Sequence, residues 1–265
     1  MKSIFDYAKI CLQSADIEQK LATTHEAWQK LQAGGLSFKS NQPVGSIALT
    51  QFPARPQLLP PRSMAKRNLN TSEGVAAMFH ALAHIEFNAI NLALDAIWRF
   101  PNLPEDYYKD WLKVAQEESY HFELLSNYLI GIGYGYGSFD AHNSLWEMVE
   151  KTKNDPLARM ALVPRTMESR GLDALPLIRK RFIQINDKEM TSILEVILND
   201  EVGHVEVGNR WFNYHCQQQG LDPIQAYADL VQKYDAPKLR GPFNYAARKA
   251  AGFTDAELAA LDIHQ

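Results

Sequence analysis

The motif Glu-x-x-His occurs twice in this chain, at Glu118–His121 and at Glu201–His204. A residue and the third residue after it lie on one face of a helix, so each motif can direct a carboxylate and an imidazole at one metal ion. About 0.5 such matches are expected by chance in a chain of this composition, so one motif alone would be weak evidence. Two motifs, each directly preceded by an acidic residue, predict a metal site inside a helical protein.

The spacing of two further glutamates places them beside these motifs. Glu86 precedes Glu118 by 32 positions, and the midpoint falls in a proline-flanked turn near Asn102. If the chain runs about 21 Å along one helix to the turn and the same distance back along the next, Glu86 and Glu118 lie side by side. Glu168 precedes Glu201 by 33 positions, with a second candidate turn at the midpoint. The two helical hairpins are therefore expected to bring six ligands to matching levels: Glu86, Glu118, His121, Glu168, Glu201 and His204.

The helical neighbours of these ligands are mostly apolar, which predicts that the ligands are buried. Charged groups in an apolar stripe cost free energy unless they are paired or bound to metal. Four carboxylates and two imidazoles in one interior therefore call for cations. One Glu from each of two helices and Glu-x-x-His from each of the other two is the ferritin-like dimetal arrangement. Mixed carboxylate and imidazole ligands suit two iron ions, with manganese or a mixed Mn/Fe pair as alternatives.

Residues next to the ligands are candidates for supporting roles. A ligating imidazole usually donates its other N–H to a carboxylate, so we expect Glu117 to orient His204 and Asp200 to orient His121. His80 and His84 are four residues apart and could bind metal. However, they lie on the opposite helical face from Glu86, which favours a hydrogen-bonding role instead.

Four residues are candidates for a direct part in catalysis, each with a structural alternative. Tyr120, inside the first motif, is either a packing residue or a redox relay. His142 either starts a helix or lines a pocket. Arg165 and Arg170, on either side of Glu168, either balance charge and form structural pairs or anchor a substrate.

The sequence pattern predicts an all-α protein. We expect Ser72 to be the N-cap of a helix over 71–100. We expect Pro104 to be the first residue of a helix over 104–130, and Gly131 to end that helix. Pro164, with Gly171 and Pro176, should kink or break the long helical segment over 155–185. The predicted helical segments are 3–33 (one or two helices), 71–100, 104–130, 144–151, 155–185, 187–218, 223–233 and 255–261.

These segments predict a ferritin-like four-helix bundle with one long crossover and extra helices at both ends. Three ranges are expected to form one compact domain: 1–70 (N-terminal helices and a proline-rich connection), 71–220 (the dimetal bundle) and 221–265 (a helical extension). The proline-rich stretch over 42–65 is either a solvated linker or a lid. The basic run over 238–244 is either a solvated tail or a basic clamp on a ligand.

Charge and composition narrow the possible partners and location. The net charge is −4, which gives no global positive field for nucleic acid, although a local basic patch stays possible. No stretch reaches the roughly 18 apolar residues that span a bilayer, so no membrane association is expected. The two cysteines, without metal or disulfide spacing, and a start that lacks a secretory pattern predict a cytoplasmic protein.

Several segments together resemble the ferritin-like domain-of-unknown-function 455 family, from about residue 40 onward. The resemblance implies a ferritin-like fold with a dimetal site at the six ligands named above. One departure is an Asp-Gly in the family pattern where this chain has Asn143–Ser144, which weakens a pocket role for that loop. The segments that carry the resemblance are 80–86, 117–122, 162–165, 168–173, 200–205 and 242–244.

The favoured function is an O₂- or peroxide-activating oxidoreductase or hydroxylase that acts on an unknown small molecule, with a reductase as a possible partner. A nucleoside in tRNA is a second substrate hypothesis, by fold-level analogy with the tRNA-adenosine hydroxylase branch of the ferritin-like superfamily. The alternatives are a ferroxidase or other iron-handling protein, and a non-enzymatic binding protein with a structural metal site. A monomer or dimer is expected, because the irregular segments would obstruct assembly into a cage.

Overall fold

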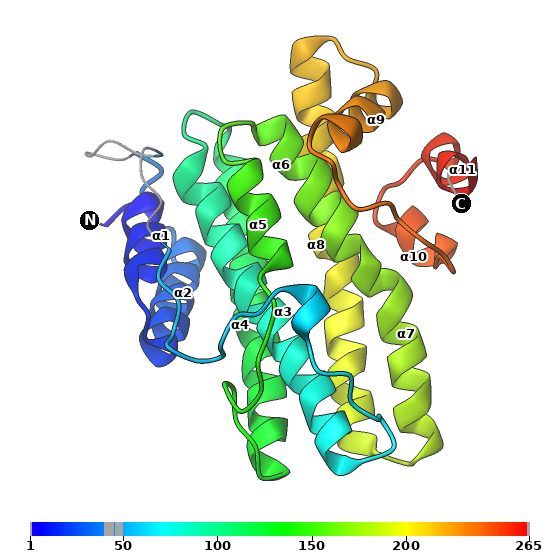
Figure 1. Cartoon of the computed structure of the whole chain (residues 1–265). Helices are drawn as coiled ribbons and strands as arrows, with labels where there is room; N and C mark the ends of the chain where they lie inside the picture. The colour runs from blue at the N-terminus through cyan, green and yellow to red at the C-terminus, as the bar shows by residue number, and fades with distance from the viewer. Residues whose placement is uncertain (1, 40–44, 46–49, 264–265) are drawn as a thin grey trace. The chain divides into compact units, whose positions relative to one another are not determined.

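The fold described here is that of a computed structural model (Figure 1). It describes residues 2–39, 45 and 50–263, so part of the predicted proline-rich connection, Pro43 included, lies outside the described residues. Within the described residues every regular element is a helix, which confirms the predicted all-α class. The extended pairing in this part of the chain amounts to two isolated bridges, Ser3 with Ser37 and Leu58 with Ala141.

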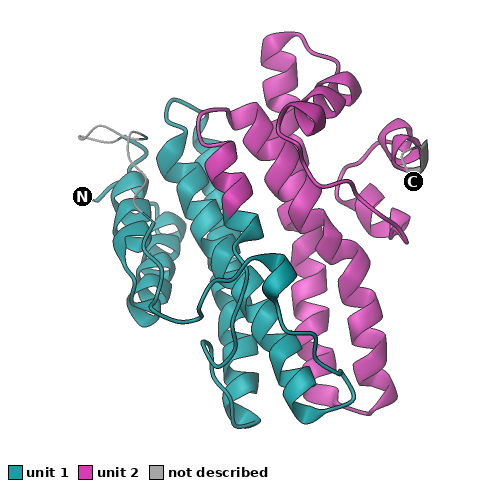
Figure 2. Ribbon diagram, in the orientation of Figure 1, with its two compact units in different colours: residues 1–146 teal, residues 147–265 magenta. Residues whose placement is uncertain are grey.

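The chain forms two compact units, Met1–Trp146 and Glu147–Gln265 (Figure 2). Helix α5 (Ser144–Lys151) crosses this boundary and has the bounds expected from the sequence. The predicted division at residues 70 and 220 stays a prediction.

Unit 1 is built around a pair of long antiparallel helices joined by a short turn. Asn102 occupies the left-handed region in that turn, with a φ of 66°. The first helix of the chain starts with a capping box, in which Ser3 and Asp6 satisfy each other's backbone N–H groups. The elements are α1 (Ile4–Gln13), α2 (Ile17–Gln32), the short 3₁₀ turn η1 (Pro61–Ser63), α3 (Ser72–Arg99) and α4 (Glu105–Gly131).

Three predicted helix ends in unit 1 are wrong by one residue. Thr71 is the N-cap of α3, because its hydroxyl accepts a hydrogen bond from the Gly74 N–H, and Ser72 is the first helical residue. Pro104 is the N-cap of α4, since its ψ of 148° is not helical. Gly131 is the last residue of α4, and the chain leaves the helix at Ile132.

In unit 2, the long segment predicted over 155–185 is broken, as expected from its prolines. The break is a π-helix, η2 (Val163–Glu168), that contains Pro164. Proline has no N–H for the helical ladder, and the ladder shifts so that the Ser169 N–H donates to the Pro164 carbonyl five residues before it. Pro176, by contrast, is tolerated inside the following α-helix.

The rest of unit 2 follows the predicted segments closely. Helix α8 starts after the N-cap Asp187 and stops before its C-cap Gly220, whose left-handed φ of 65° suits that position. The short helix α10, with the sequence YAARKA, was not predicted, because six residues give no readable period. The elements are α6 (Pro156–Leu162), η2, α7 (Ser169–Gln184), α8 (Lys188–Gln219), α9 (Pro223–Lys233), α10 (Tyr245–Ala250) and α11 (Asp255–Ile263).

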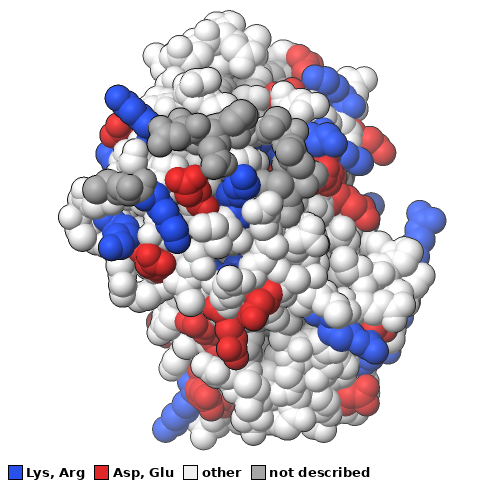
Figure 3. All heavy atoms as spheres, turned by 90° about the vertical axis from the view of Figure 1, so that its left-hand side faces the viewer, with Lys and Arg blue, Asp and Glu red and all other residues white. Residues whose placement is uncertain are grey.

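The charged side chains have both signs on the face shown in Figure 3, where basic and acidic groups are interspersed. This distribution fits the small net charge of −4. Within the residues that the structure describes, none of the helices combines the length and the apolar character needed for a bilayer crossing.

Candidate metal centre

The first candidate ligand set, Glu86, Glu118 and His121, lies on the α3–α4 pair of unit 1. All three side chains are buried, with His121 fully so. The Nδ1 atom of His121 lies 3.6 Å from Oε2 of Glu86 and 3.5 Å from Oε2 of Glu118. The spacing of 32 residues therefore does bring Glu86 level with the motif, as predicted.

These distances are close to those between donors that share a cation. Metal bonds of about 2.1 Å from nitrogen and oxygen place two donors on one cation roughly 3.0–3.5 Å apart. Two carboxylates beside one imidazole in a buried place carry negative charge, whose burial is costly unless a cation balances it. The first set is thus chemically suited to a divalent cation.

The second candidate ligand set, Glu168, Glu201 and His204, lies in unit 2. All three side chains are buried. His204 Nδ1 lies 3.6 Å from Oε1 of Glu201, so this motif has the same internal geometry as the first. Glu168 is the last residue of η2. The carboxylate of Glu201 reaches the turn after Glu168, because a Cβ added to Gly171 would lie 3.8 Å from Glu201 Oε2.

Glu118, His121, Glu201 and His204 make up a buried group of carboxylates and imidazoles that could hold metal ions. These are the two Glu-x-x-His motifs found in the sequence. The predicted support of His204 by Glu117 and of His121 by Asp200 stays a prediction. Glu117 is half-buried and its carboxylate lies 3.4 Å from Lys113 Nζ.

The candidate catalytic residues are placed very differently from one another. Tyr120 is 47% exposed although its neighbours Glu118 and His121 are buried. Arg170 is exposed. His142 is exposed and its Nδ1 accepts a 3.4 Å hydrogen bond from the Ser144 N–H at the start of α5, which favours the helix-start interpretation.

Arg165 is buried and forms structural pairs. Its guanidinium donates to Asn209 Oδ1 at 2.7 Å and to Glu257 Oε1 at 2.5 Å. This favours the interpretation of Arg165 as a structural partner over that of a substrate anchor.

His80 and His84 anchor the glycine-rich turn that follows α4. His80 Nε2 accepts a hydrogen bond from the Gly137 N–H at 2.8 Å, and His84 Nδ1 lies 2.8 Å from the Tyr136 hydroxyl. Burial lowers the pKa of both imidazoles to about 4. The hydrogen-bonding role predicted for the two histidines is confirmed.

Sequence reasoning missed how closely α8 approaches η2. A Cβ added to Gly208 would lie 2.6 Å from Cβ of Pro164 and 2.7 Å from its Cγ, so only glycine fits there. Gly208 is one helical turn after His204. A proline within a helical segment signalled the break, but nothing in the sequence paired Pro164 with this glycine.

Comparison with known proteins identifies the family but not an activity. A protein from Haemophilus influenzae, described as an uncharacterized protein, is 47% identical over 228 residues, which cover 83% of this chain and 78% of that protein. No solved structure matches the chain. The sequence profile of the family described as protein of unknown function (DUF455) matches residues 13–259. The chain therefore belongs to the DUF455 family.

Proposed function

We propose that the two ligand sets together hold two metal ions, best matched by iron, in a ferritin-like arrangement, and that the protein is an oxidoreductase that activates O₂ or peroxide. The proposal is carried by one observation, the position of His121 beside two buried carboxylates, those of Glu86 and Glu118. The equivalent Glu201–His204 motif in unit 2 supplies matching donors. Mixed carboxylate and imidazole ligands favour iron or manganese.

The chain's own residues have three tasks in this proposal. The carboxylates neutralise the cations, and the imidazoles complete the ligand set. The apolar side chains around them, such as Phe122 and Val205, are buried and keep bulk water away. A bound, reduced metal pair would supply the electrons that activate O₂ or peroxide, and a reductase or chemical reductant would restore them.

The substrate is proposed to be a small organic molecule, and a nucleoside in tRNA is the weaker alternative because it rests on fold-level analogy. The buried position of the ligands favours a reaction in which an oxidant forms away from water. A ferroxidase would consume O₂ in proportion to added ferrous iron and leave organic additives unchanged.

The test starts with metal analysis of anaerobically purified protein, followed by spectroscopy during exposure to O₂ with a reductant present. We expect about two iron ions per chain, O₂ consumption, and loss of both properties in His121→Ala and His204→Ala. His25→Ala serves as the control, because His25 is exposed. Full metal content in both ligand variants, or a reduced iron-loaded protein that is inert toward O₂ and peroxide, would refute the proposal.

A further inference from the structure

We infer that residues 244–258, here called the C-terminal clamp, fix the position of Glu168, and that Arg165 and Arg248 are positioning residues for the metal site. Only the metal-binding part of the proposed function is needed for this inference. All the contacts that carry it lie within unit 2.

The π-helix that carries Glu168 needs support from outside itself. A π-helix packs its backbone less favourably than an α-helix and is usually limited to short stretches. Pro164 removes one backbone donor from η2, and Glu168 is its last residue. Small changes in how η2 is held would therefore move the Glu168 carboxylate.

Arg165 ties the interior of η2 to the clamp. It is buried and donates to Glu257 Oε1 in α11 and to Asn209 Oδ1 in α8. Glu257 is itself fixed, because its Oε2 accepts hydrogen bonds from the backbone N–H and the hydroxyl of Thr254, at 2.8 and 2.9 Å. The strength of a charge-assisted hydrogen bond between two buried side chains, such as Arg165 and Glu257, depends on how well they are aligned. The chain thus links η2 to a residue 92 positions later.

Aromatic rings surround the Arg165 guanidinium and leave it little freedom. Its central carbon lies 4.8 Å from the ring centroid of Phe212, 5.2 Å from that of Tyr227 and 4.6 Å from that of Phe253. Tyr227 also contacts η2 directly, since its hydroxyl lies 2.9 Å from Thr166 Oγ1. Stacking against several rings suits the planar guanidinium and not an ammonium group.

Arg248 holds the chain on the other side of Glu168. It is fully buried and forms a two-point pair with Asp173, at 3.1 Å from Nε to Oδ1 and 2.6 Å from Nη2 to Oδ2. The same Nη2 atom donates to the carbonyl of Ser169, the residue directly after Glu168, at 3.3 Å. The Asn244 N–H adds a 2.8 Å hydrogen bond to Asp173 Oδ1.

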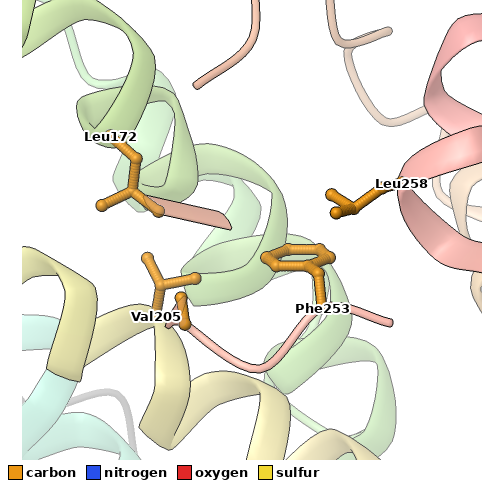
Figure 4. Close-up of a cluster of buried hydrophobic side chains, with 5 residues drawn as sticks. Leu172, Val205, Phe253 and Leu258 are labelled. Carbon is orange, nitrogen blue, oxygen red and sulfur yellow. The ribbon is translucent and has the colours of Figure 1, made fainter. Parts of the chain in front are cut away.

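An apolar cluster packs the clamp against α7, which follows Glu168, and against α8, which carries His204. Figure 4 shows Phe253 and Leu258 of the clamp with Leu172 of α7 and Val205 of α8. Val205 is the residue after His204. The clamp therefore contacts Arg165 before Glu168, Ser169 directly after it, and Val205 directly after His204.

The inference is tested on the full chain with Co²⁺ as the probe, whose visible spectrum reports coordination geometry. We expect Glu257→Gln, which keeps the side-chain shape and removes the charge, to weaken Co²⁺ binding by about 10–100-fold and to shift the spectrum. Glu257→Asp should restore part of the affinity. The matched control is Asp255→Asn, because Asp255 lies in α11 like Glu257 and its pair with Lys249 of α10 is exposed.

A second readout does not depend on metal. In the metal-free protein, we expect Glu257→Gln to speed amide exchange over 163–169 by about 10-fold or more while exchange around Glu86 stays unchanged. If Glu257→Gln does not fold, Asp173→Asn provides the same test at the second pair. Unchanged exchange together with unchanged Co²⁺ affinity and spectrum would overturn the clamp. If Glu257→Gln speeds exchange over 163–169 but the wild-type protein binds no Co²⁺, the proposed function is refuted and the clamp still stands.

Discussion

The two units carry the same set of candidate ligands, two glutamates and one histidine, on different backbones. Glu86 lies in the middle of the uninterrupted helix α3, and its partners are on the adjacent helix α4. Glu168 ends a π-helix, and Arg165 in that π-helix is paired with Glu257, far along the chain. The first carboxylate is therefore placed by one helical hairpin, and the second depends on a remote segment. Equal ligand chemistry can thus rest on local packing in one unit and on long-range contacts in the other.

The difference has a physical consequence for how each carboxylate can move. A helix interior is held by its own ladder of hydrogen bonds, so Glu86 shifts only if α3 shifts. A π-helix at a ligand has weaker internal support, and such elements are frequent at functional sites. We expect the Glu168 side to adjust more readily than the Glu86 side.

The largest effect should come from neutralising one carboxylate in each set. Glu86→Gln and Glu168→Gln keep the side-chain size and remove the negative charge that a cation needs. We expect each to lower the affinity for one of the two metal ions by at least about 100-fold, measured by titration and by metal analysis. If either variant bound both metal ions as tightly as the wild-type protein, the two sets would not be equivalent in metal binding.

Acidification should weaken the turn held by His80 in unit 1 before it weakens the Arg165–Glu257 pair in unit 2. Burial, with a smaller contribution from the Arg67 charge, lowers the pKa of His80 from 6.5 to about 4. Between these values the unfolded chain binds a proton that the folded chain does not. The stability that neutral His80 contributes is thus complete above pH 6.5 and is lost as the pH falls toward 4, by up to about 3 kcal/mol.

In unit 2, burial alone would raise the pKa of Glu257, but the charge of Arg165 and the hydrogen bonds from Thr254 lower it below 4.5. Its contribution is present above pH 4.5 and is lost only below it. As the pH falls from 7 to 4, the protection of backbone amides in the metal-free protein, corrected for the intrinsic pH dependence of exchange, should therefore decrease around Gly137 before it decreases over 163–169. The His80→Gln variant should lose that part of the pH dependence. An unchanged pH profile in this variant would show that His80 does not cause it.

A smaller effect should follow from Gly208→Ala, because the added methyl group would meet Pro164 at less than 3 Å. Overpacking of this kind costs about 1–3 kcal/mol, and here it would push η2 away from α8. Gly203→Ala is the matched control on the same helix, since no atom lies within 4 Å of a Cβ added there. We expect the control to stabilise the protein by up to about 1 kcal/mol in denaturant unfolding. Destabilisation of equal size in both variants would contradict the close approach.

Helix positions and the burial of the candidate ligands could be predicted from the sequence because both depend on short-range patterns. The motifs at Glu118 and Glu201 are readable from a spacing of three, and the level of Glu86 follows from the length of one hairpin. Pro164 marked the break between α6 and α7. Caps were wrong by one residue where two neighbours could cap equally well, as with Thr71 and Ser72.

The contacts that hold the second set could not be predicted, because they join positions that no local pattern relates. Arg165 reads from the sequence as a charge beside Glu168, and its partner Glu257 lies in a helix of ordinary composition. The pair of Arg248 and Asp173 spans 75 positions. The type of helix also escaped prediction, since a proline signals a lost hydrogen bond but not whether a kink or a π-helix replaces it.

The smallest effect is expected from Tyr120→Phe, which tests whether the residue inside the first motif takes part in the chemistry. Tyr120 is 47% exposed, and at the equivalent place the second motif has Gly203, which has no side chain. A ring at such a position contributes little to the buried ligand set, so we expect unfolding free energy within about 0.5 kcal/mol of wild type and unchanged metal content.

The informative measurement is the rate at which the reduced, iron-loaded Tyr120→Phe variant reacts with O₂. If the two motifs act only as ligands, the rate should match wild type, because the phenol hydroxyl is then not needed. A clear loss of rate with full metal content would make Tyr120 an electron relay. It would also make unit 1 the chemically active half of a pair whose ligands are otherwise alike.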